Sequence, residues 1–403
     1  MRAVIEKGVA NGKVCAPPSK SMAHRLLIAA AYANGVSHIK GVSSCEDVLA
    51  TVDCLTALGA SFFPDGDTVT VYGTDFKKSK PKGTLYCRES GSTLRFLIPT
   101  ALLSGEEAVF AGAKRLIERP HGVYEELCKE KGFKFINDGE KITVSGRLTA
   151  GEYYMRADVS SQFITGMLYA LSALPSPSRI HLTTKIESKP YIDMTLSALS
   201  MFGASCHFED ESTIYISGGG YRAADVTVEG DYSGAAFTEA LSTLGGEVSV
   251  MGLNEHSLQG DRVYREHFKA LANGYAEIDI ESCPDLGPIL FTVAAAKHGA
   301  RFTGTKRLKI KESDRAMAMA EELSKFGAKV KVFENEVIVS KAKLHTPTEI
   351  LMGHNDHRVV MSLAVLCTLY GGEIDGFEAI KKSYPEFGRD LETLGIKVKY
   401  YET

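Results

Sequence analysis

One pattern of apolar and polar positions recurs six times along the chain. Each copy is a helical stretch of small and apolar residues that begins with polar residues, usually ends at a glycine and is usually followed by a β-like run. Ordered recurrence of one supersecondary pattern predicts a repeat architecture rather than an ordinary α/β fold with a chance rhythm. The six stretches are Ser21–Gly35, Ser92–Gly105, Ser161–Leu174, Ser233–Gly245, Asp285–Gly299 and His357–Gly371.

A second helical pattern follows each of the first ones. In one of these helices, Ala316, Met319, Ala320 and Leu323 have the spacing of a single apolar face. Short strand-like runs such as Val330–Phe333 and Lys397–Tyr401 follow most of them. We therefore predict a helix–strand–helix–strand module used six times, three in each half of the chain. The second helices are expected at Asp47–Gly59, Tyr124–Gly132, Ile192–Gly203, Arg262–Gly274, Asp314–Gly327 and Arg389–Gly395.

The spacing of the closing glycines is uneven in one place. Gly245 and Gly299 lie 54 residues apart, whereas Gly299 and Gly371 lie 72 residues apart. We interpret the fifth module as a shorter copy with trimmed loops.

Length and composition narrow the class of protein. A chain of 403 residues has room for two or three domains, and 44% apolar with 24% charged residues is typical of a soluble globular protein. The formal net charge of −4 argues against a general nucleic-acid binder, which is usually strongly basic. It does not exclude a local basic pocket.

The cysteines and histidines show no spacing typical of a metal site. None of the eight cysteines forms a CxxC pair, and no Cys/His cluster has zinc-ligand spacing, so we expect no metal and mostly packed, reduced thiols. The N-terminal residues lack the apolar stretch of a signal peptide, and no run is long enough to span a bilayer. We therefore predict a cytoplasmic protein with no membrane association.

Several predicted helices begin with small polar residues that are followed by a cation within one turn. Serine and threonine are natural N-caps, but a cation there opposes the helix dipole by about 0.3–1 kcal/mol. A bound anion reverses that sign, because backbone N–H groups, hydroxyls and a guanidinium then converge on it. Each arginine alone could equally pair with a neighbouring carboxylate; together they favour a shared polyanion site. The segments are Ser19–Arg25, Glu89–Arg95, Lys311–Arg315 and Asn355–Arg358.

Two carboxylates accompany these segments. Asp285 follows Pro284 at the start of a predicted helix, and Glu312 lies beside Lys311. Asp285 is equally consistent with a structural helix cap, so the local sequence leaves its role open.

Taken together, these segments closely resemble the EPSP synthase family. The matches run in the family order from one end of the chain to the other, and the combination is specific although each short motif is not. The matching stretches are Pro18–Arg25, Glu89–Arg95, Ser160–Phe163, Ser188–Tyr191, Glu229–Asp231, Pro284–Asp285, Lys311–Arg315, Asp356–Arg358 and Lys382–Pro385.

The resemblance implies a fold. The chain should be an α/β protein of two similar inside-out domains, each built from three repeated βαβαββ-like units, with a double crossover near Pro18 and Glu229. The N-terminal domain would then comprise residues 19–228, and the C-terminal domain residues 1–18 plus 229–403. The active site would lie in the interdomain cleft.

The resemblance also implies an activity. The chain would transfer the enolpyruvyl group of phosphoenolpyruvate (PEP) to the 5-hydroxyl of shikimate 3-phosphate and release phosphate, without a cofactor and as a monomer. The nearest alternative is a UDP-N-acetylglucosamine enolpyruvyl transferase, whose cysteine-bearing loop is not evident. A non-catalytic anion-binding protein on the same scaffold is the other alternative, and the presence of both Asp285 and Glu312 argues against it.

Site residues are implied by matching positions. Asp285 would accept the hydroxyl proton and Glu312 would donate a proton, with Lys20 as a third catalytic group. Shikimate 3-phosphate would be bound by Lys20, Ser21, Arg25, Ser160, Ser161, Gln162, Ser188, Asp285 and Lys311. PEP would be bound by Lys20, Gly91, Arg119, Gln162, Arg315, Arg358 and Lys382.

Two positions depart from the family pattern. Glu89 and Arg307 stand where many relatives have asparagine, and Glu89 would weaken anion binding unless Arg88 or Arg95 pairs with it. Gly91 is retained, and a larger residue there would crowd the glyphosate-binding space. We therefore predict inhibition by glyphosate.

Overall fold

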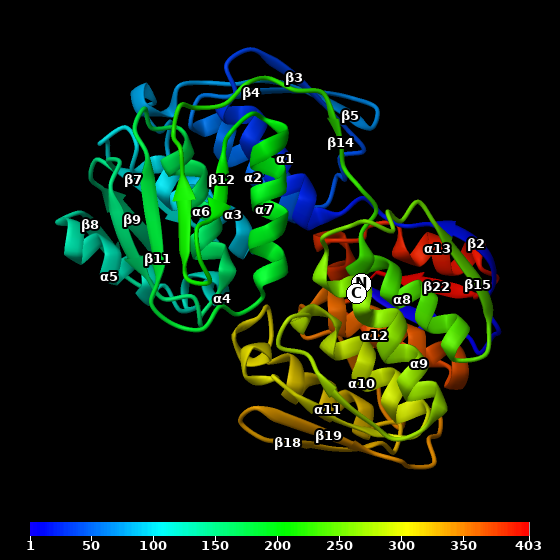
Figure 1. Cartoon of the computed structure of the whole chain (residues 1–403). Coiled ribbons are helices and arrows are strands. Elements are labelled where there is room, and N and C mark those ends of the chain that lie inside the picture. Colours follow the sequence, from blue (N-terminus) through cyan, green and yellow to red (C-terminus); the bar gives the residue numbers. More distant parts are fainter. Residues whose placement is uncertain (403) are drawn as a thin grey trace. The chain divides into compact units, whose positions relative to one another are not determined.

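The computed structural model of the chain describes residues 1–402. The contacts within the chain separate two units (Figure 1). One is the Lys20–Glu229 unit. The other, called here the C-terminal unit, combines Met1–Ser19 with the residues from Gly230 onward.

The Lys20–Glu229 unit contains three four-stranded sheets with one common topology, in the orders β14-β3-β5-β4, β6-β7-β9-β8 and β10-β11-β13-β12. In each sheet the first two strands are parallel and the other neighbours are antiparallel. The strands are β3 (Val36–Lys40), β4 (Ser61–Asp65), β5 (Thr68–Tyr72), β6 (Leu85–Tyr86), β7 (Ala108–Ala111), β8 (Lys134–Asn137), β9 (Lys141–Ser145), β10 (Glu152–Met155), β11 (Ser178–Leu182), β12 (Cys206–Phe208), β13 (Thr213–Ile216) and β14 (Val226–Thr227).

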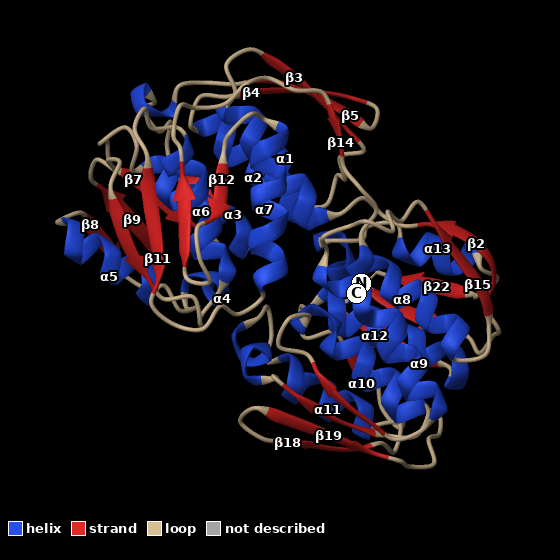
Figure 2. Ribbon diagram, viewed as in Figure 1, coloured by secondary structure: helices blue, strands red, loops and turns tan. Residues whose placement is uncertain are grey.

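Alternation of side chains turns one face of each sheet inward. In β5, Val69 and Val71 are buried whereas Thr68, Thr70 and Tyr72 are not. This pattern is typical of a sheet with one face on a core and one face in solvent. The strands accordingly lie around the helices of the unit (Figure 2).

The first helices of the three modules are buried on nearly every side. These are α1 (Lys20–Tyr32), α3 (Gly91–Ala101) and α6 (Ser161–Ser172). Small residues allow them to pack closely: a Cβ added at Gly166 would lie 2.4 Å from the carbonyl oxygen of Arg95. A helix that is apolar all round belongs in a core, so the helices are inside and the sheets outside. The second helices are α2 (Glu46–Ala57), α5 (Gly122–Lys131) and α7 (Lys189–Met201), with the short α4 (Lys114–Ile117) and η1 (Phe76–Lys78) between elements.

The C-terminal unit repeats this plan, and its sheets contain strands from both the N-terminal and the C-terminal parts of the chain. Its sheets have the orders β16-β17-β19-β18 and β20-β21-β1-β22, and a third sheet pairs β15 with β2. The N-terminal strand β1 lies between β21 and β22, with Ala3 opposite both Ile374 and Tyr400. The strands are β1 (Arg2–Ile5), β2 (Asn11–Cys15), β15 (Glu247–Met251), β16 (Ala276–Asp279), β17 (Ala300–Thr303), β18 (Lys329–Val332), β19 (Glu336–Ser340), β20 (Leu351–Met352), β21 (Gly372–Asp375) and β22 (Val398–Tyr401).

The helices of the C-terminal unit follow the same division. The buried first helices are α8 (Tyr232–Thr243), α10 (Gly287–Ala296) and α12 (His357–Tyr370), and the second helices are α9 (Tyr264–Asn273), α11 (Arg315–Ser324) and α13 (Phe387–Thr393). Short 3₁₀ turns precede or join them: η2 (Gly260–Val263), η3 (Pro284–Leu286), η4 (Lys306–Ile310) and η5 (Phe377–Lys382). The predicted α/β class with repeated βαβαββ-like modules is confirmed.

The short spacing between Gly245 and Gly299 does not come from trimmed loops in the fifth module, as the sequence analysis predicted. In the described part of the chain, the β2–β15 sheet has two strands, and α9 leads directly to β16 of the next module. This module therefore lacks the β-hairpin that supplies the third and fourth strands elsewhere. The missing hairpin, rather than trimmed loops in the fifth module, shortens the spacing between Gly245 and Gly299.

Within residues 1–402, none of the helices has the combination of length and hydropathy that crossing a bilayer requires. The eight cysteines are free, and most are buried.

Candidate active site

In the Lys20–Glu229 unit, the first turns of the buried helices carry polar and cationic side chains. Ser90 caps α3, because its Oγ accepts a hydrogen bond from the Thr93 N–H at 3.1 Å. Ser160 caps α6 by accepting from the Gln162 N–H at 3.3 Å. These are the hydroxyl caps that the sequence pattern predicts, and they leave the positive ends of the helix dipoles next to the cations.

Arg25 is held rigidly although it is charged and only 2% exposed. Its Nε donates to Thr195 Oγ1 at 2.9 Å, its Nη1 to the Ser21 carbonyl at 2.8 Å and its Nη2 to the Tyr191 carbonyl at 2.9 Å. The guanidinium also lies 5.4 Å from the centre of the Phe96 ring. With no carboxylate among these partners, its positive charge stays available for an anion.

Lys20, at the start of α1, pairs with the carboxylate of Asp47 on α2 at 3.0 Å. Both side chains are largely buried. Asp47 therefore fixes the direction of the Lys20 ammonium.

Arg95 and Gln162 join the first turns of α3 and α6. Arg95 Nη1 donates to Gln162 Oε1 at 2.8 Å, and Gln162 Nε2 donates to Ser92 Oγ at 3.1 Å. Arg119 is also buried, and a Cβ added at Gly91 would lie 2.9 Å from Arg119 Nη1. The absence of a side chain at Gly91 therefore leaves space for this guanidinium.

Ser188 precedes α7 in a left-handed conformation, with φ of 55°. Such a conformation costs energy for a residue other than glycine, and it occurs often at functional sites. Ser188 is buried.

In the C-terminal unit, Arg315 is surrounded by carboxylates. It is 1% exposed and bonds to Asp356 Oδ2 at 2.9 Å, Asp285 Oδ1 at 2.8 Å and Glu312 Oε2 at 2.6 Å. Burial by itself would lower the pKa of Arg315, but Asp356, Glu312 and Asp285 together raise it. The guanidinium is thus fully charged and fixed by acidic groups from three segments of the unit.

Asp285 receives further cations. Arg358 Nη2 lies 3.0 Å from Asp285 Oδ2, and Lys311 Nζ lies 3.1 Å from Asp285 Oδ1. Burial lowers the pKa of Lys311 to about 8 against the opposing pull of Asp285, with Arg307 and Arg315 adding to the lowering. Three cations on one carboxylate favour its ionised form.

Lys382 lies at the end of η5 and donates to the Asn355 carbonyl at 2.5 Å and to Asn355 Oδ1 at 2.8 Å. His354 and Asn355 have φ of 49° and 51°, so this turn leads into α12 through two left-handed residues. Asp356 then caps α12 by accepting from the Arg358 N–H at 2.9 Å. The same carboxylate therefore orients Arg315 and starts the helix that carries Arg358.

Comparison with known proteins identifies the family. The family model described as EPSP synthase (3-phosphoshikimate 1-carboxyvinyltransferase) matches residues 5–391. The chain belongs to the EPSP synthase family. A 3-phosphoshikimate 1-carboxyvinyltransferase of Clostridium kluyveri is 38% identical, with 96% of each chain covered. One of Clostridium novyi is 37% identical over 96% of this chain and 95% of the relative.

Solved structures agree in fold. EPSP synthase from Acinetobacter baumannii superposes with a TM-score of 0.77 at 23% identity, over 99% of this chain and 100% of that one. The enolpyruvyl transferase NikO from Streptomyces tendae gives a TM-score of 0.79 at 15% identity, over 100% and 99%. Both share the inside-out α/β fold described above.

The structure assigns the residues expected for an EPSP synthase site to two groups. The Lys20–Glu229 unit carries Lys20, Ser21, Arg25, Gly91, Arg119, Ser160, Ser161, Gln162 and Ser188. The C-terminal unit carries Asp285, Lys311, Glu312, Arg315, Arg358 and Lys382. Within the C-terminal unit, ion pairs join Asp285 and Glu312 to the expected cations.

Sequence reasoning did not assign several residues that orient these groups. Arg95 and Asp356 lie inside the recognised segments but had no assigned role, whereas Asp47 and Thr195 lie outside them. Asp47 falls on a second helix 27 residues from Lys20, and Thr195 falls 170 residues from Arg25. Local spacing carries no signal for such distant partners.

Arg88 and Arg95, the two arginines near Glu89, both have polar partners in the structure. Arg88 pairs with Glu46 and with Asp53, the latter at 2.8 Å. Arg95 bonds to Gln162 and to the Pro120 carbonyl.

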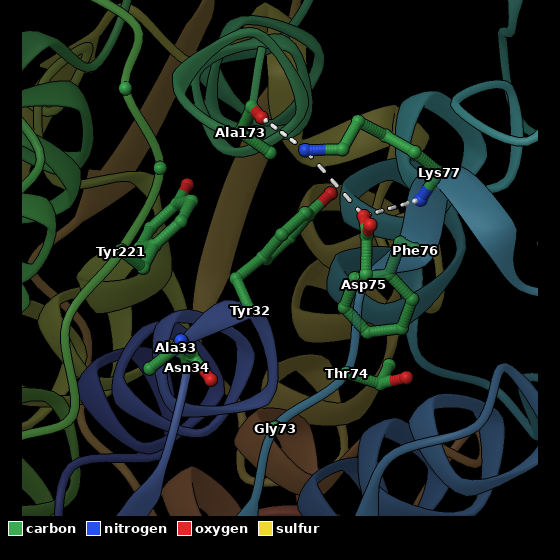
Figure 3. A pocket seen from close by; sticks show the side chains of 12 residues that line it. Tyr32, Ala33, Asn34, Gly73, Thr74, Asp75, Phe76, Lys77, Ala173 and Tyr221 are labelled. Atoms are coloured by element: carbon green, nitrogen blue, oxygen red, sulfur yellow. Dashed lines mark hydrogen bonds and ion pairs between the residues drawn. The ribbon is translucent and has the colours of Figure 1, made fainter. Parts of the chain in front are cut away.

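The Lys20–Glu229 unit also has a cavity of about 460 Å³ at the opposite ends of α1 and α6 (Figure 3). Tyr32, Lys77 and Tyr221 line it, and Lys77 donates to the Ala173 carbonyl at 3.1 Å. None of the residues expected to bind substrate is among its lining residues, so this cavity is separate from the site described above.

Proposed function

We propose that the two groups of residues act together on one pair of substrates. The activity is that of a 3-phosphoshikimate 1-carboxyvinyltransferase. The enolpyruvyl group of PEP passes to the 5-hydroxyl of shikimate 3-phosphate, which gives 5-enolpyruvylshikimate 3-phosphate and inorganic phosphate.

The observation that carries the assignment of roles is the ion-pair network around Arg315. It brings Asp285 and Glu312 onto one guanidinium, at 2.8 and 2.6 Å. A proton acceptor and a proton donor for one reaction must lie within reach of the same reacting atoms. The shared contact of Asp285 and Glu312 with Arg315 supports giving them these roles.

The shikimate-phosphate side is assigned to Lys20, Ser21, Arg25, Ser160, Ser161, Gln162, Ser188, Asp285 and Lys311. Arg25 supplies a charge that three neutral groups orient, and hydroxyls and helix N-termini supply donors to a phosphate. PEP is assigned to Lys20, Gly91, Arg119, Gln162, Arg315, Arg358 and Lys382. Together the substrates bring two phosphates and a carboxylate, and this number of cations offsets their mutual repulsion.

Proton transfer follows from the surroundings of the two carboxylates. Asp285 is kept ionised by Lys311, Arg315 and Arg358, so it can accept the proton of the attacking 5-hydroxyl. Glu312 protonates the methylene carbon of PEP, for which it must first carry a proton. PEP bound to Arg315 adds negative charge beside Glu312 and so favours its protonated form.

The sequence of bonds is addition and then elimination. The hydroxyl oxygen bonds to C2 of PEP while the methylene carbon gains a proton. The tetrahedral adduct then loses phosphate and a proton, and the double bond re-forms. Holding both reactants in one site can supply up to about 7–11 kcal/mol of positioning in ideal cases.

The direct test mixes the purified protein with shikimate 3-phosphate and PEP and measures release of inorganic phosphate. UDP-N-acetylglucosamine serves as the control acceptor. We expect release of phosphate from PEP when shikimate 3-phosphate is the acceptor, and none when the UDP-sugar replaces it. Release only with the UDP-sugar would transfer the assignment to the other enolpyruvyl acceptor, and binding of anions without release would indicate a non-catalytic protein.

We also propose that the enzyme is cytoplasmic, acts as a monomer and uses no cofactor. Size-exclusion chromatography with light scattering should give about the mass of one 43.7 kDa chain.

A further inference from the structure

A continuous chain of hydrogen bonds crosses α1, α2 and α3 of the Lys20–Glu229 unit. His24 Nδ1 lies 2.7 Å from Thr51 Oγ1, Thr51 Oγ1 lies 2.7 Å from Thr93 Oγ1, and Thr93 Oγ1 lies 2.8 Å from Ser90 Oγ. Each of the four residues is 0% exposed. We call His24, Thr51, Thr93 and Ser90 the hydroxyl chain.

Counting protons gives the hydroxyl chain a direction. Burial, followed by the charges of Lys20 and Arg25, lowers the pKa of His24 well below its ordinary value, so the ring is neutral. His24 Nε2 is buried without a hydrogen-bond partner, and a buried N–H without an acceptor is rarer than a buried acceptor without a donor. The proton therefore belongs on Nδ1, which donates to Thr51.

The remaining links follow from that choice. Thr51 has one hydroxyl proton and donates it to Thr93, and Thr93 donates to Ser90. Loss of the Thr51 hydroxyl would leave a buried N–H unpaired on one side and Thr93 without its donor on the other. The links therefore depend on one another.

One end of the hydroxyl chain fixes the start of α3. Ser90 Oγ accepts both the Thr93 hydroxyl and the Thr93 N–H, so it sets the first turn of the helix. Gly91 follows at once, and a Cβ added there would lie 2.9 Å from Arg119 Nη1. A small displacement of this turn would change the space in which Arg119 lies.

The middle of the hydroxyl chain connects to Lys20 through α2. Thr51 lies one turn after Asp47 on that helix, and Asp47 Oδ2 binds Lys20 Nζ at 3.0 Å. Thr93 Oγ1 also lies 3.4 Å from the Asp47 carbonyl. One helix thus contacts both the lysine and the first turn of α3.

We propose that Thr51 and Thr93 are positioning residues for PEP binding, because they hold the Gly91 turn at a fixed distance from Lys20. This rests on the proposed function, in which Lys20, Gly91 and Arg119 bind PEP. Neither threonine touches a substrate; both act through Ser90 and Asp47.

The test compares Thr51→Val and Thr93→Val with the wild-type enzyme. Valine keeps the shape of threonine and removes the hydroxyl. The KM for PEP should rise by about fivefold or more, since a misplacement of about 1 Å can already cost about 10²-fold in a positioned site. The KM for shikimate 3-phosphate should rise less than the KM for PEP, because Gly91 and Arg119 are assigned to PEP alone and Arg25 keeps its own partners. Thr51→Ser, which retains the hydroxyl, should restore the KM for PEP.

Thr100→Val is the matched control. Thr100 lies at the other end of α3, is 1% exposed and accepts a hydrogen bond from Tyr32 at 2.7 Å. The Thr100→Val variant should lower the melting temperature as the test variants do. It should leave the KM for PEP and the KM for shikimate 3-phosphate unchanged. That contrast separates a positioning role from a general loss of stability.

Equal KM values for PEP in Thr51→Val, Thr100→Val and the wild-type enzyme would overturn the proposal. An increase that Thr51→Ser fails to reverse would also overturn it. Thr93→Val should also raise the KM for PEP, so the test can still be made if one of the two variants fails to fold. Failure of the proposed function is distinguishable, because the wild-type enzyme would then release no phosphate from PEP.

Discussion

At the scale of single residues, Asp285 is the group on which the charges of the C-terminal unit converge. Lys311, Arg315 and Arg358 all contact its carboxylate. Asp285→Asn keeps the shape and removes the basic oxygen, so kcat should fall by about 10²–10⁴-fold. Binding of shikimate 3-phosphate, measured by titration calorimetry, should change little. A kcat near that of the wild-type enzyme would remove the role of proton acceptor.

Glu312→Gln should have a similar effect on kcat, by about 10²–10⁴-fold, because glutamine cannot donate the proton to the methylene carbon. Proton incorporation from solvent into that carbon can be followed by NMR in deuterium oxide. Glu321→Gln is the control, since Glu321 is an exposed carboxylate on α11. Equal loss of activity in both variants would indicate a general effect of charge rather than proton transfer by Glu312.

Gly91→Ala should weaken PEP binding and weaken inhibition by glyphosate. The new Cβ would lie 2.9 Å from Arg119 Nη1 and 3.5 Å from Gln162 Oε1, so the guanidinium must move. We expect the wild-type enzyme to be inhibited by glyphosate at subsaturating PEP, and the variant to show a higher KM for PEP and a higher glyphosate concentration at half inhibition. Gly122→Ala, at a position with no atom within 4 Å of the added Cβ, should change neither value.

The ionisation of Lys311 should limit activity at high pH. Its pKa is lowered to about 8, so its charge is present below that pH and lost as the pH rises through it. The ratio kcat/KM for shikimate 3-phosphate should therefore fall above about pH 8. Lys311→Arg, which stays charged, should move this fall to higher pH. An unchanged alkaline limb in the variant would assign the fall to another group.

At the scale of elements, Glu322 ties α11 to the turn before α12. It is fully buried and accepts from His354 Nε2 at 3.0 Å, from Lys325 Nζ at 3.0 and 2.9 Å and from the Met352 N–H at 2.8 Å. Its bond to His354 raises the pKa of that imidazole above the ordinary 6.5. Burial would raise the pKa of Glu322, but His354, Lys325 and Met352 together lower it below 4.5.

These shifts predict how stability depends on pH. The raised pKa of His354 stabilises the fold fully below pH 6.5, and this contribution is lost as the pH rises through the folded-state value. The lowered pKa of Glu322 stabilises the fold above pH 4.5, and this contribution is lost as the pH falls through the folded-state value. His354→Asn should therefore lower the free energy of unfolding more at about pH 6 than at about pH 8.5. Asparagine tolerates the left-handed backbone there.

Urea unfolding at the two pH values checks this expectation. His256→Asn, at an exposed position, should show no such difference. An equal loss at both pH values for His354→Asn would show that the charge of the imidazole is not involved.

At the scale of the whole molecule, the buried apolar residues form two separate clusters. One is drawn from Met22–Val228, and the other combines Ala3–Val14 with Tyr232–Ile396. Each unit thus has a core of its own, which is the condition for independent folding. A fragment of residues 20–229 should fold alone and unfold in one cooperative thermal transition.

A fragment of residues 230–403 should not fold alone. It lacks β1, which lies between β21 and β22, and β2, the partner of β15. Attaching residues 1–19 through a flexible linker should restore its circular dichroism spectrum. Folding without these residues would show that the two N-terminal strands are not needed for the core.

The sequence by itself determined what depends on neighbours along the chain. The period of the six buried helices, the serine caps and the second helices are local patterns, and residues such as Ser90 and Ser160 cap where those patterns predict. The family motifs supplied expected roles for Lys20, Asp285 and Glu312. The roles of these residues stay predictions.

Only the tertiary structure decided what depends on residues far apart in the chain. Spacing does not reveal that β1 completes a sheet with β21 and β22, that the β2–β15 module lacks its hairpin, or that Asp47 and Thr195 orient Lys20 and Arg25. The physical reason is that a hydrogen bond or ion pair forms when two groups meet in space. Local propensity fixes the helix on which a side chain lies, whereas packing of whole modules determines its partner.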